Sequence, residues 1–122
     1  MKYSYYPGCS LELNASAYDQ SAKAVAKPVG VELQEIDDWN CCGATEYISL
    51  NKLAAYALVA RNLVKAKEQK LGTLVAPCSA CFLNLSKAES YLTESEKLRG
   101  EVNLAMQAGG MTYTPGGLSV RH

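Results

Sequence analysis

The chain has 122 residues, enough for a single domain with a modest apolar core, and its 12 basic side chains balance its 12 acidic ones. A formal net charge of zero gives no long-range field to attract a polyanion, so nucleic acid is not an expected partner. The first ten residues lack the apolar core of a secretion signal, and no stretch approaches the roughly 18 apolar residues of a membrane span. We therefore expect a cytoplasmic protein without a membrane span.

The first third of the chain predicts two strands with a helix between them. Residues 2–6 read as a strand ended by Pro7-Gly8, and residues 31–36 read as a second strand. Between them, residues 15–27 predict a helix that Pro28 and Gly30 bring to an end.

The remainder predicts three helices and one more strand. Residues 48–70 repeat apolar side chains at helical spacing, and residues 73–76 form a short apolar run typical of a buried strand. Helices are then expected over 78–91 and 93–107. Residues 109–122 are rich in Gly and Pro and are expected to form a tail, or a linker to an absent second domain, so the domain proper is expected at 1–108.

Strands and helices that alternate in this way are typical of βαβ units. The expected fold is therefore α/β, with three layers: a short parallel sheet flanked by helices. In such a sheet ligands bind beyond the carboxyl ends of the strands, which lie along one edge.

All five cysteines fall just beyond predicted strand ends. Cys9 follows the first strand, Cys41 and Cys42 follow the second, and Cys78 and Cys81 follow the third. Because these strand ends share one edge, the sequence predicts that the five thiols gather there as a metal site.

Three chemistries could use these thiols. A dithiol oxidoreductase would use Cys78 and Cys81 at a helix N-terminus, where the thiol pKa is lowered, and a structural zinc site would use four thiolates. An iron-sulfur cluster contains several metals, so a fifth thiolate can be shared among them, and only this interpretation gives every cysteine a role. An odd number of cysteines in a reducing compartment argues against a disulfide framework.

The sequence resembles the CCG-domain (cysteine-rich domain) family, and within it the N-terminal CCG domain of heterodisulfide reductase B subunits. The likeness covers roughly residues 1–92, with 31 residues between Cys9 and Cys41 and 34 between Gly43 and Cys78. The segments that match are Tyr6-Pro-Gly-Cys-Ser10, Asp38-Trp-Asn-Cys-Cys-Gly-Ala44, Ala60-Arg-Asn-Leu63 and Pro77-Cys-Ser-Ala-Cys81.

This resemblance implies a non-cubane 4Fe-4S cluster held by all five cysteines, at which a disulfide substrate is reduced. No protein side chain beyond the cluster is implied as catalytic. The implied partners are a ferredoxin-like iron-sulfur subunit and a flavin subunit of a heterodisulfide reductase complex. The family's full subunit carries two CCG domains, so this chain looks like one half and could be inactive alone. CCG domains also occur in other oxidoreductase complexes, where electron transfer is the implied role.

Two further residues have more than one interpretation. Trp39, beside the cysteine doublet, could shield a cofactor from water or simply pack at a strand end. Arg61, on the predicted helix over 48–70, could neutralise a bound anion or lie solvated on the surface.

Overall fold

The structure is a computed structural model that describes residues 1–9, 15–43 and 47–122. Ser10 and Ala44, which belong to the matching segments, lie outside the described residues. The elements in chain order are β1 (Lys2–Tyr5), α2 (Ser16–Ala26), β2 (Glu32–Glu35), α3 (Tyr47–Leu50), α4 (Lys52–Glu68), β3 (Thr73–Val75), α5 (Ser79–Glu94), α6 (Glu96–Met106), the 3-10 helix η1 (Gln107–Gly109) and β4 (Ser119–Arg121).

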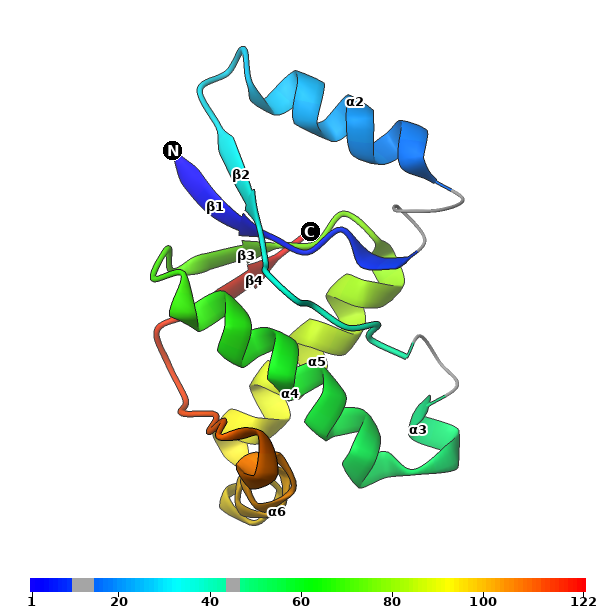
Figure 1. Cartoon of the computed structure of the whole chain (residues 1–122), viewed down its shortest axis with the longest axis vertical. Helices are drawn as coiled ribbons and strands as arrows, with labels where there is room; N and C mark the ends of the chain where they lie inside the picture. The colour runs from blue at the N-terminus through cyan, green and yellow to red at the C-terminus, as the bar shows by residue number, and fades with distance from the viewer. Residues whose placement is uncertain (10–14, 44–46) are drawn as a thin grey trace.

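Four parallel strands form one sheet in the order β2-β1-β3-β4 (Figure 1). Their register aligns the last residue of every strand: Tyr5 pairs with both Glu35 and Val75, and Val75 pairs with Arg121. All four chain segments therefore leave the sheet from the same edge and at the same level. The expected α/β fold with a parallel sheet and flanking helices is confirmed.

Helices lie on both faces of this sheet (Figure 1). On one face, α2 buries none of its residues and is tied to the sheet by the Tyr5 hydroxyl, which donates to the Asp19 carboxylate at 2.6 Å. On the other face, α4 and α5 cover the core, which includes Leu63 of α4, Leu74 of β3 and Leu85 of α5, all fully buried. No helix within the described ranges combines the length and the apolarity needed to cross a bilayer.

The expected helix over 48–70 is two helices, because Asn51 interrupts it. The Asn51 backbone is extended, with φ −156° and ψ 106°, and its side chain accepts a hydrogen bond from the Ala54 amide at 3.0 Å. Asparagine favours such an N-cap because its carbonyl oxygen satisfies an amide that lacks a partner in the first turn. Apolar spacing alone continues across the interruption and does not reveal it.

Ser95 separates α5 from α6, four residues after the expected end of the first helix. Its backbone is extended, and its hydroxyl accepts a hydrogen bond from the Leu98 amide at 3.1 Å. One residue therefore ends α5 and begins α6, and the chain turns between two helices that both contribute to the core.

Replacing Ser95 with alanine is expected to lower the free energy of unfolding by about 1 kcal/mol, because the amide of Leu98 loses its acceptor. Urea denaturation followed by circular dichroism measures the change. Ser90→Ala, within α5, is the matched control, and is expected to be neutral or slightly stabilising since alanine favours the helix. Equal changes in both variants would show that Ser95 has no capping role.

Residues 109–122 differ from the expected tail, since they end in a strand of the sheet. Ser119 begins β4 and donates its amide to the Gly72 carbonyl at 2.9 Å, and the Tyr113 side chain is 2 % exposed. The side chain of Asn103 in α6 holds the Tyr113 backbone by two hydrogen bonds, of 2.8 and 3.1 Å. A strand of three residues is too short to show a period, and its partner β3 lies far away in sequence. That these residues also lead into a second domain stays a prediction.

Candidate metal centre

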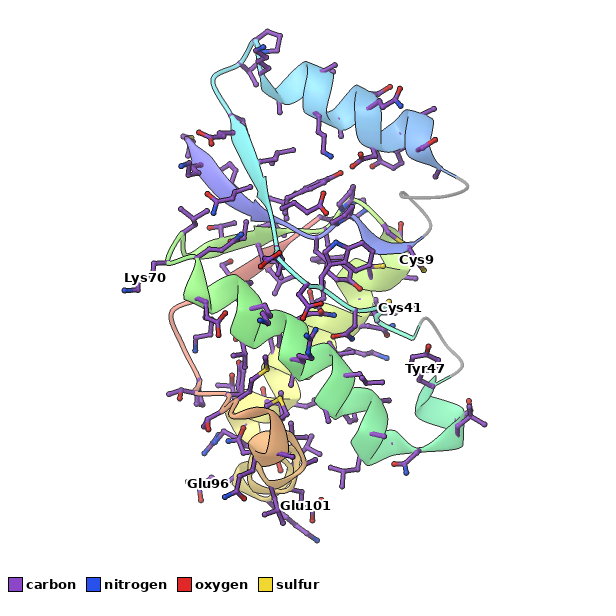
Figure 2. All side chains as sticks on the ribbon, in the orientation of Figure 1. Cys9, Cys41, Tyr47, Lys70, Glu96 and Glu101 are labelled. Atoms are coloured by element: carbon purple, nitrogen blue, oxygen red, sulfur yellow. The ribbon has the colours of Figure 1, made fainter. Side chains whose placement is uncertain are left out.

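The aligned strand ends bring the chain segments that contain the cysteines to one edge of the sheet. Figure 2 labels Cys9 and Cys41 on this side of the molecule, although they follow different strands. Cys9 comes shortly after β1, the cysteine doublet follows β2, and Cys78 follows β3 at the N-cap of α5. The sulfurs of Cys9 and Cys41 are 3.6 Å apart. Segments far apart in sequence are thus in contact through their thiols.

A second pair joins the other half of the doublet to α5. The thiols of Cys42 and Cys81 are hydrogen-bonded with their sulfurs 3.4 Å apart, and these residues are only 5 % and 4 % exposed. The first pair lies further out, since Cys9 is exposed and Cys41 half-buried. Cys78, the N-cap residue of α5, is the fifth thiol, and its proximity contributes to the raised pKa of Cys81. The two thiols of the doublet therefore contact two different segments, Cys41 the one with Cys9 and Cys42 the one with Cys81.

The spacing of these sulfurs suits metal ligation more than disulfide bonding. None of the five cysteines, all of which the structure describes, forms a disulfide, and sulfurs 3.4 to 3.6 Å apart are far beyond the roughly 2.05 Å of such a bond. Two thiolates on one tetrahedral metal, with bonds of about 2.3 Å, are about 3.8 Å apart. Among the described residues, however, no group of three or more histidine, cysteine, aspartate or glutamate side chains is arranged to hold a metal ion. The arrangement is two thiol pairs with a fifth thiol beside them.

Burial and mutual hydrogen bonding keep thiols of this group protonated. The hydrogen bond with Cys42, together with burial, raises the pKa of Cys81 well above its ordinary value. Burial also raises the pKa of Cys41. The nucleophile of a dithiol oxidoreductase needs the opposite shift, because it is a thiolate formed near neutral pH, so Cys81 does not suit that role. A bound metal would deprotonate its ligands and supply the positive charge that this cluster of thiols lacks.

Two glycines adapt the backbone to these thiols. Gly8 has φ +80°, and a Cβ at this position would lie 2.8 Å from the sulfur of Cys81, so no side chain fits there. Gly43 has φ +85°, and its amide donates to the sulfur of Cys41 at 3.3 Å. Amide hydrogen bonds to sulfur are one means by which proteins tune an iron-sulfur centre.

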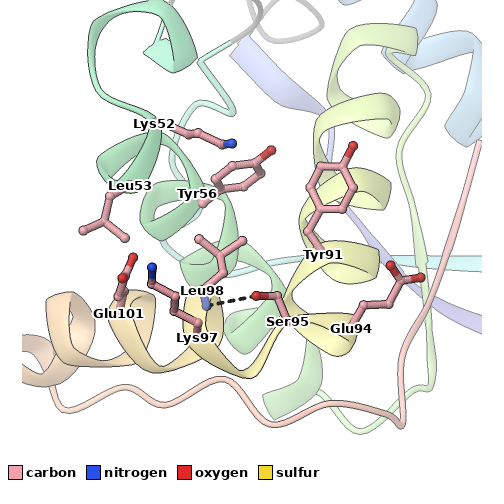
Figure 3. A pocket seen from close by; sticks show the side chains of 9 residues that line it. All are labelled: Lys52, Leu53, Tyr56, Tyr91, Glu94, Ser95, Lys97, Leu98 and Glu101. Atoms are coloured by element: carbon pink, nitrogen blue, oxygen red, sulfur yellow. Dashed lines mark hydrogen bonds between the residues drawn. The ribbon is translucent and has the colours of Figure 1, made fainter.

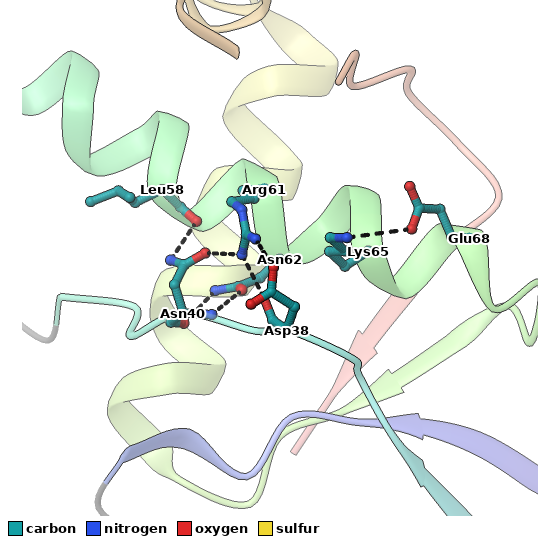
Figure 4. Close-up of polar contacts among 7 residues, drawn as sticks. All are labelled: Asp38, Asn40, Leu58, Arg61, Asn62, Lys65 and Glu68. Atoms are coloured by element: carbon teal, nitrogen blue, oxygen red, sulfur yellow. Dashed lines mark hydrogen bonds and ion pairs between the residues drawn. The ribbon is translucent and has the colours of Figure 1, made fainter. Parts of the chain in front are cut away.

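A polar network on α4 holds the segment that precedes the doublet (Figure 4). The side chain of Asn62 pairs with the backbone of Asn40, and Arg61 pairs with the Asp38 carboxylate at 2.5 Å. Arg61 is therefore engaged within the chain and is neither a solvated surface residue nor free for an anion. Sequence reasoning did not single out Asn62; the available signal was a polar residue on the otherwise apolar face of the helix.

Aromatic side chains cover the same segment from the sheet. Tyr6 is fully buried, and its hydroxyl donates to the Asn40 carbonyl at 2.7 Å. Burial, and then the charge that nearby thiolates would place beside it, raises the pKa of Tyr6, so its hydroxyl stays protonated as a donor. Trp39 packs edge-on against the Tyr6 ring, with the ring centroids 5.2 Å apart, and its indole N–H donates to Glu35. Packing is thus the role that the structure shows for Trp39.

A separate cavity of about 530 Å³ lies between α4, α5 and α6 (Figure 3). Tyr56 and Tyr91 face it with their rings 6.0 Å apart. No cysteine lines this cavity, so it is not part of the thiol site. The residues that line it are Lys52, Leu53, Tyr56, Tyr91, Glu94, Ser95, Lys97, Leu98 and Glu101.

Two known proteins are similar to this chain over most of its length. The chain is 34 % identical over 112 residues to the 8-methylmenaquinol:fumarate reductase membrane anchor subunit of Wolinella succinogenes, covering 92 % of this chain and 38 % of that protein. It is 24 % identical over 114 residues to a heterodisulfide reductase B-subunit-like protein of Archaeoglobus profundus, covering 93 % and 38 %. The chain thus spans well under half the length of these relatives.

A solved structure and a family model complete the comparison. The crystal structure of a hypothetical protein from Helicobacter pylori superposes with a TM-score of 0.83 over 98 % of this chain and 24 % of that one, and its 17 % identity supports a likeness of fold alone. Residues 3–86 match the model of the CCG family, described as a cysteine-rich domain. Since this match covers more than half of the chain and includes all five cysteines, the chain belongs to the CCG cysteine-rich domain family.

Proposed function

We propose that this chain binds a non-cubane 4Fe-4S cluster and acts as an iron-sulfur redox subunit, or part of one, of heterodisulfide-reductase type. The ligands in this proposal are Cys9, Cys41, Cys42, Cys78 and Cys81. The observation that carries the proposal is the contact of the doublet with two separate segments, at 3.6 Å to Cys9 and at 3.4 Å to Cys81. Thiolates are the protein ligands on which iron-sulfur clusters depend, so the donor set fits the group.

The number of thiols favours several metals over one zinc ion. A structural zinc site closes four ligands around a single point. The chain has five cysteines, so a single zinc ion would leave one of them without a role. Several irons can each take one or two of such thiolates. The alternative is a structural zinc-binding or assembly domain. Measuring the metal content of the protein distinguishes it from the iron-sulfur proposal.

The protein's own contribution is to shape and dry the site. The inner thiols of Cys42 and Cys81 are shielded from water, and the Gly43 amide donates to the sulfur of Cys41. Burial and such hydrogen bonds set the reduction potential of a bound cluster. The outer thiol of Cys9 is exposed, so a substrate or an electron donor would approach from its side. The cluster, when bound, supplies the electron-transfer chemistry.

The names of the relatives support two roles for such a site. The heterodisulfide reductase B-like relative supports reduction of a disulfide, in which two electrons and two protons convert one disulfide into two thiols. The name of that relative refers to a subunit, which supports a complex with other subunits. The partners we propose from the family resemblance are a ferredoxin-like iron-sulfur subunit and a flavin subunit, which would deliver the electrons. The fumarate reductase relative is more similar in sequence, and it favours a second candidate: an electron-transfer domain of another oxidoreductase complex.

Anaerobic reconstitution with iron and sulfide tests the proposal. We expect about four iron and four sulfide per chain, with an EPR signal in one oxidation state of the cluster. Stoichiometric zinc, with no iron or sulfide taken up, would support the structural alternative instead. The two redox roles are separated by adding a disulfide to the reduced protein, in which each chain holds one cluster and so one transferable electron. Reoxidation of two chains with two thiols formed per disulfide indicates disulfide reduction, and no reaction favours electron transfer alone.

A further inference from the structure

Asn62 is a fully buried polar residue whose side chain forms hydrogen bonds with the backbone of Asn40. Its side-chain oxygen accepts from the Asn40 amide at 3.0 Å, and its side-chain nitrogen donates to the Asn40 carbonyl at 2.9 Å. The amide of one side chain thus pairs with both polar groups of one peptide residue, as a neighbouring strand would. A buried amide without partners is costly, so these two bonds specify how α4 and the segment from β2 meet.

Arg61, the preceding residue of α4, holds the same segment from the solvent side. Its guanidinium donates to the Asp38 carbonyl at 2.6 Å and to the side-chain oxygen of Asn40 at 2.9 Å, besides its pairing with the Asp38 carboxylate. Asp38 has φ +54°, an unusual conformation for a residue with a side chain. The side chain of Asn40 adds a hydrogen bond to the Leu58 carbonyl at 3.0 Å. Residues 38–40 are therefore attached to α4 at several points.

These attachments fix the residue that directly precedes the cysteine doublet. The doublet has to direct Cys41 towards Cys9 and Cys42 towards Cys81, and these partners belong to two other segments. We infer that Asn62, with Arg61 beside it, is a positioning residue for the doublet: its side-chain amide clamps Asn40 and so sets where Cys41 and Cys42 present their sulfurs. That the doublet ligates a metal rests on the function proposed above, whereas the hydrogen bonds of Asn62 to Asn40 position the doublet in the metal-free chain as well.

The chain contains a matched control for this clamp. Asn103 of α6 pairs in the same way with the amide and carbonyl of Tyr113, at 2.8 and 3.1 Å. That second clamp holds the segment leading to β4 and contacts no cysteine. Replacing either asparagine with leucine removes two equivalent hydrogen bonds. Asn62 is fully buried and Asn103 half-buried, so the two variants are compared by the reactivity of the cysteines and not by stability.

The test compares Asn62→Leu, Asn103→Leu and the unchanged full chain. In the metal-free protein, alkylation of individual cysteines is followed by mass spectrometry. We expect Cys42 to react about tenfold faster in Asn62→Leu and at the unchanged rate in Asn103→Leu, because loss of the two bonds to Asn40 favours local opening of the doublet. After anaerobic reconstitution, Asn62→Leu is expected to shift the EPR signal and lose iron faster, while Asn103→Leu keeps the original signal.

Arg61→Met gives a second route if Asn62→Leu does not fold, since Arg61 is partly exposed and its loss leaves the core intact. Arg61→Met is also expected to accelerate alkylation of the doublet. The inference is overturned if Asn62→Leu and the unchanged chain are alkylated at equal rates. If Asn62→Leu does not fold, equal rates in Arg61→Met and in the unchanged chain overturn it. If the unchanged chain takes up no iron, the proposed function fails, but the alkylation rates still decide whether the clamp positions the doublet.

Discussion

Replacing Cys42 with alanine is expected to reduce the iron content of the reconstituted protein from about four atoms per chain to less than one. Cys42 is 5 % exposed and its sulfur lies 3.4 Å from that of Cys81, so water has little access to take its place as a ligand. The alanine leaves the surrounding apolar contacts largely intact, and the metal-free variant is expected to fold. Iron and sulfide analysis, with circular dichroism of the metal-free protein, measures both effects.

Ser79→Ala is the matched control for this experiment. Ser79 lies between Cys78 and Cys81 in the same turn of α5, but its side chain is exposed. It is expected to keep the full iron content and the original EPR signal. Retention of four irons by Cys42→Ala would contradict the five-cysteine ligand set and leave Cys42 as a packing residue.

Replacing Gly8 with alanine is expected to lower the free energy of unfolding by about 3 kcal/mol and to prevent cluster assembly. The backbone at Gly8 has φ +80°, which alone costs an alanine about 1 kcal/mol. The added Cβ would lie 2.8 Å from the Cys81 sulfur, and overpacking of this kind costs about 1 to 3 kcal/mol more. Relief of the collision moves the thiol of Cys81 away from Cys42. Chemical denaturation and iron content measure the two consequences.

Gly30→Ala separates backbone strain from this collision. Gly30 has nearly the same conformation, with φ +77°, but nothing lies within 4 Å of the position that an added Cβ would take. We expect a loss of about 1 kcal/mol and an unchanged iron content, since only the backbone cost applies. Equal destabilisation by the two variants, with cluster assembly preserved in both, would show that Gly8 does not have to accommodate Cys81.

The parallel sheet could be predicted because three of its strands are separated by recognisable helices and ended by punctuating residues. The elements that were missed depend on contacts between distant parts of the chain. β4 has only three residues, and it is a strand because β3 offers it a partner. Asn51 breaks a continuous apolar pattern through its own capping hydrogen bond, which helical spacing does not register.

For the candidate site, the sequence predicted that the cysteines would gather but not how they are held. Their convergence follows from where strands end, which is a local property. The clamp of Asn62 on Asn40 requires α4 to pack against the segment after β2, and this packing is a property of the folded chain. Metal ligation by the five cysteines stays a prediction that the experiments above decide.

The common level at which the four strands end makes the site sensitive to length. One residue added within β1, β2 or β3 would advance the following segment by about 3.3 Å and turn its side chains to the opposite face of the sheet. Such a shift is close to the 3.4 Å that separates the sulfurs of Cys42 and Cys81, so a single insertion would move these two sulfurs out of contact. Insertions are expected to be tolerated better at the opposite edge, before β2 and β3, where a Cβ added at Gly30 or Gly72 would meet nothing within 4 Å. The length of the chain is thus constrained at one edge of the sheet and variable at the other.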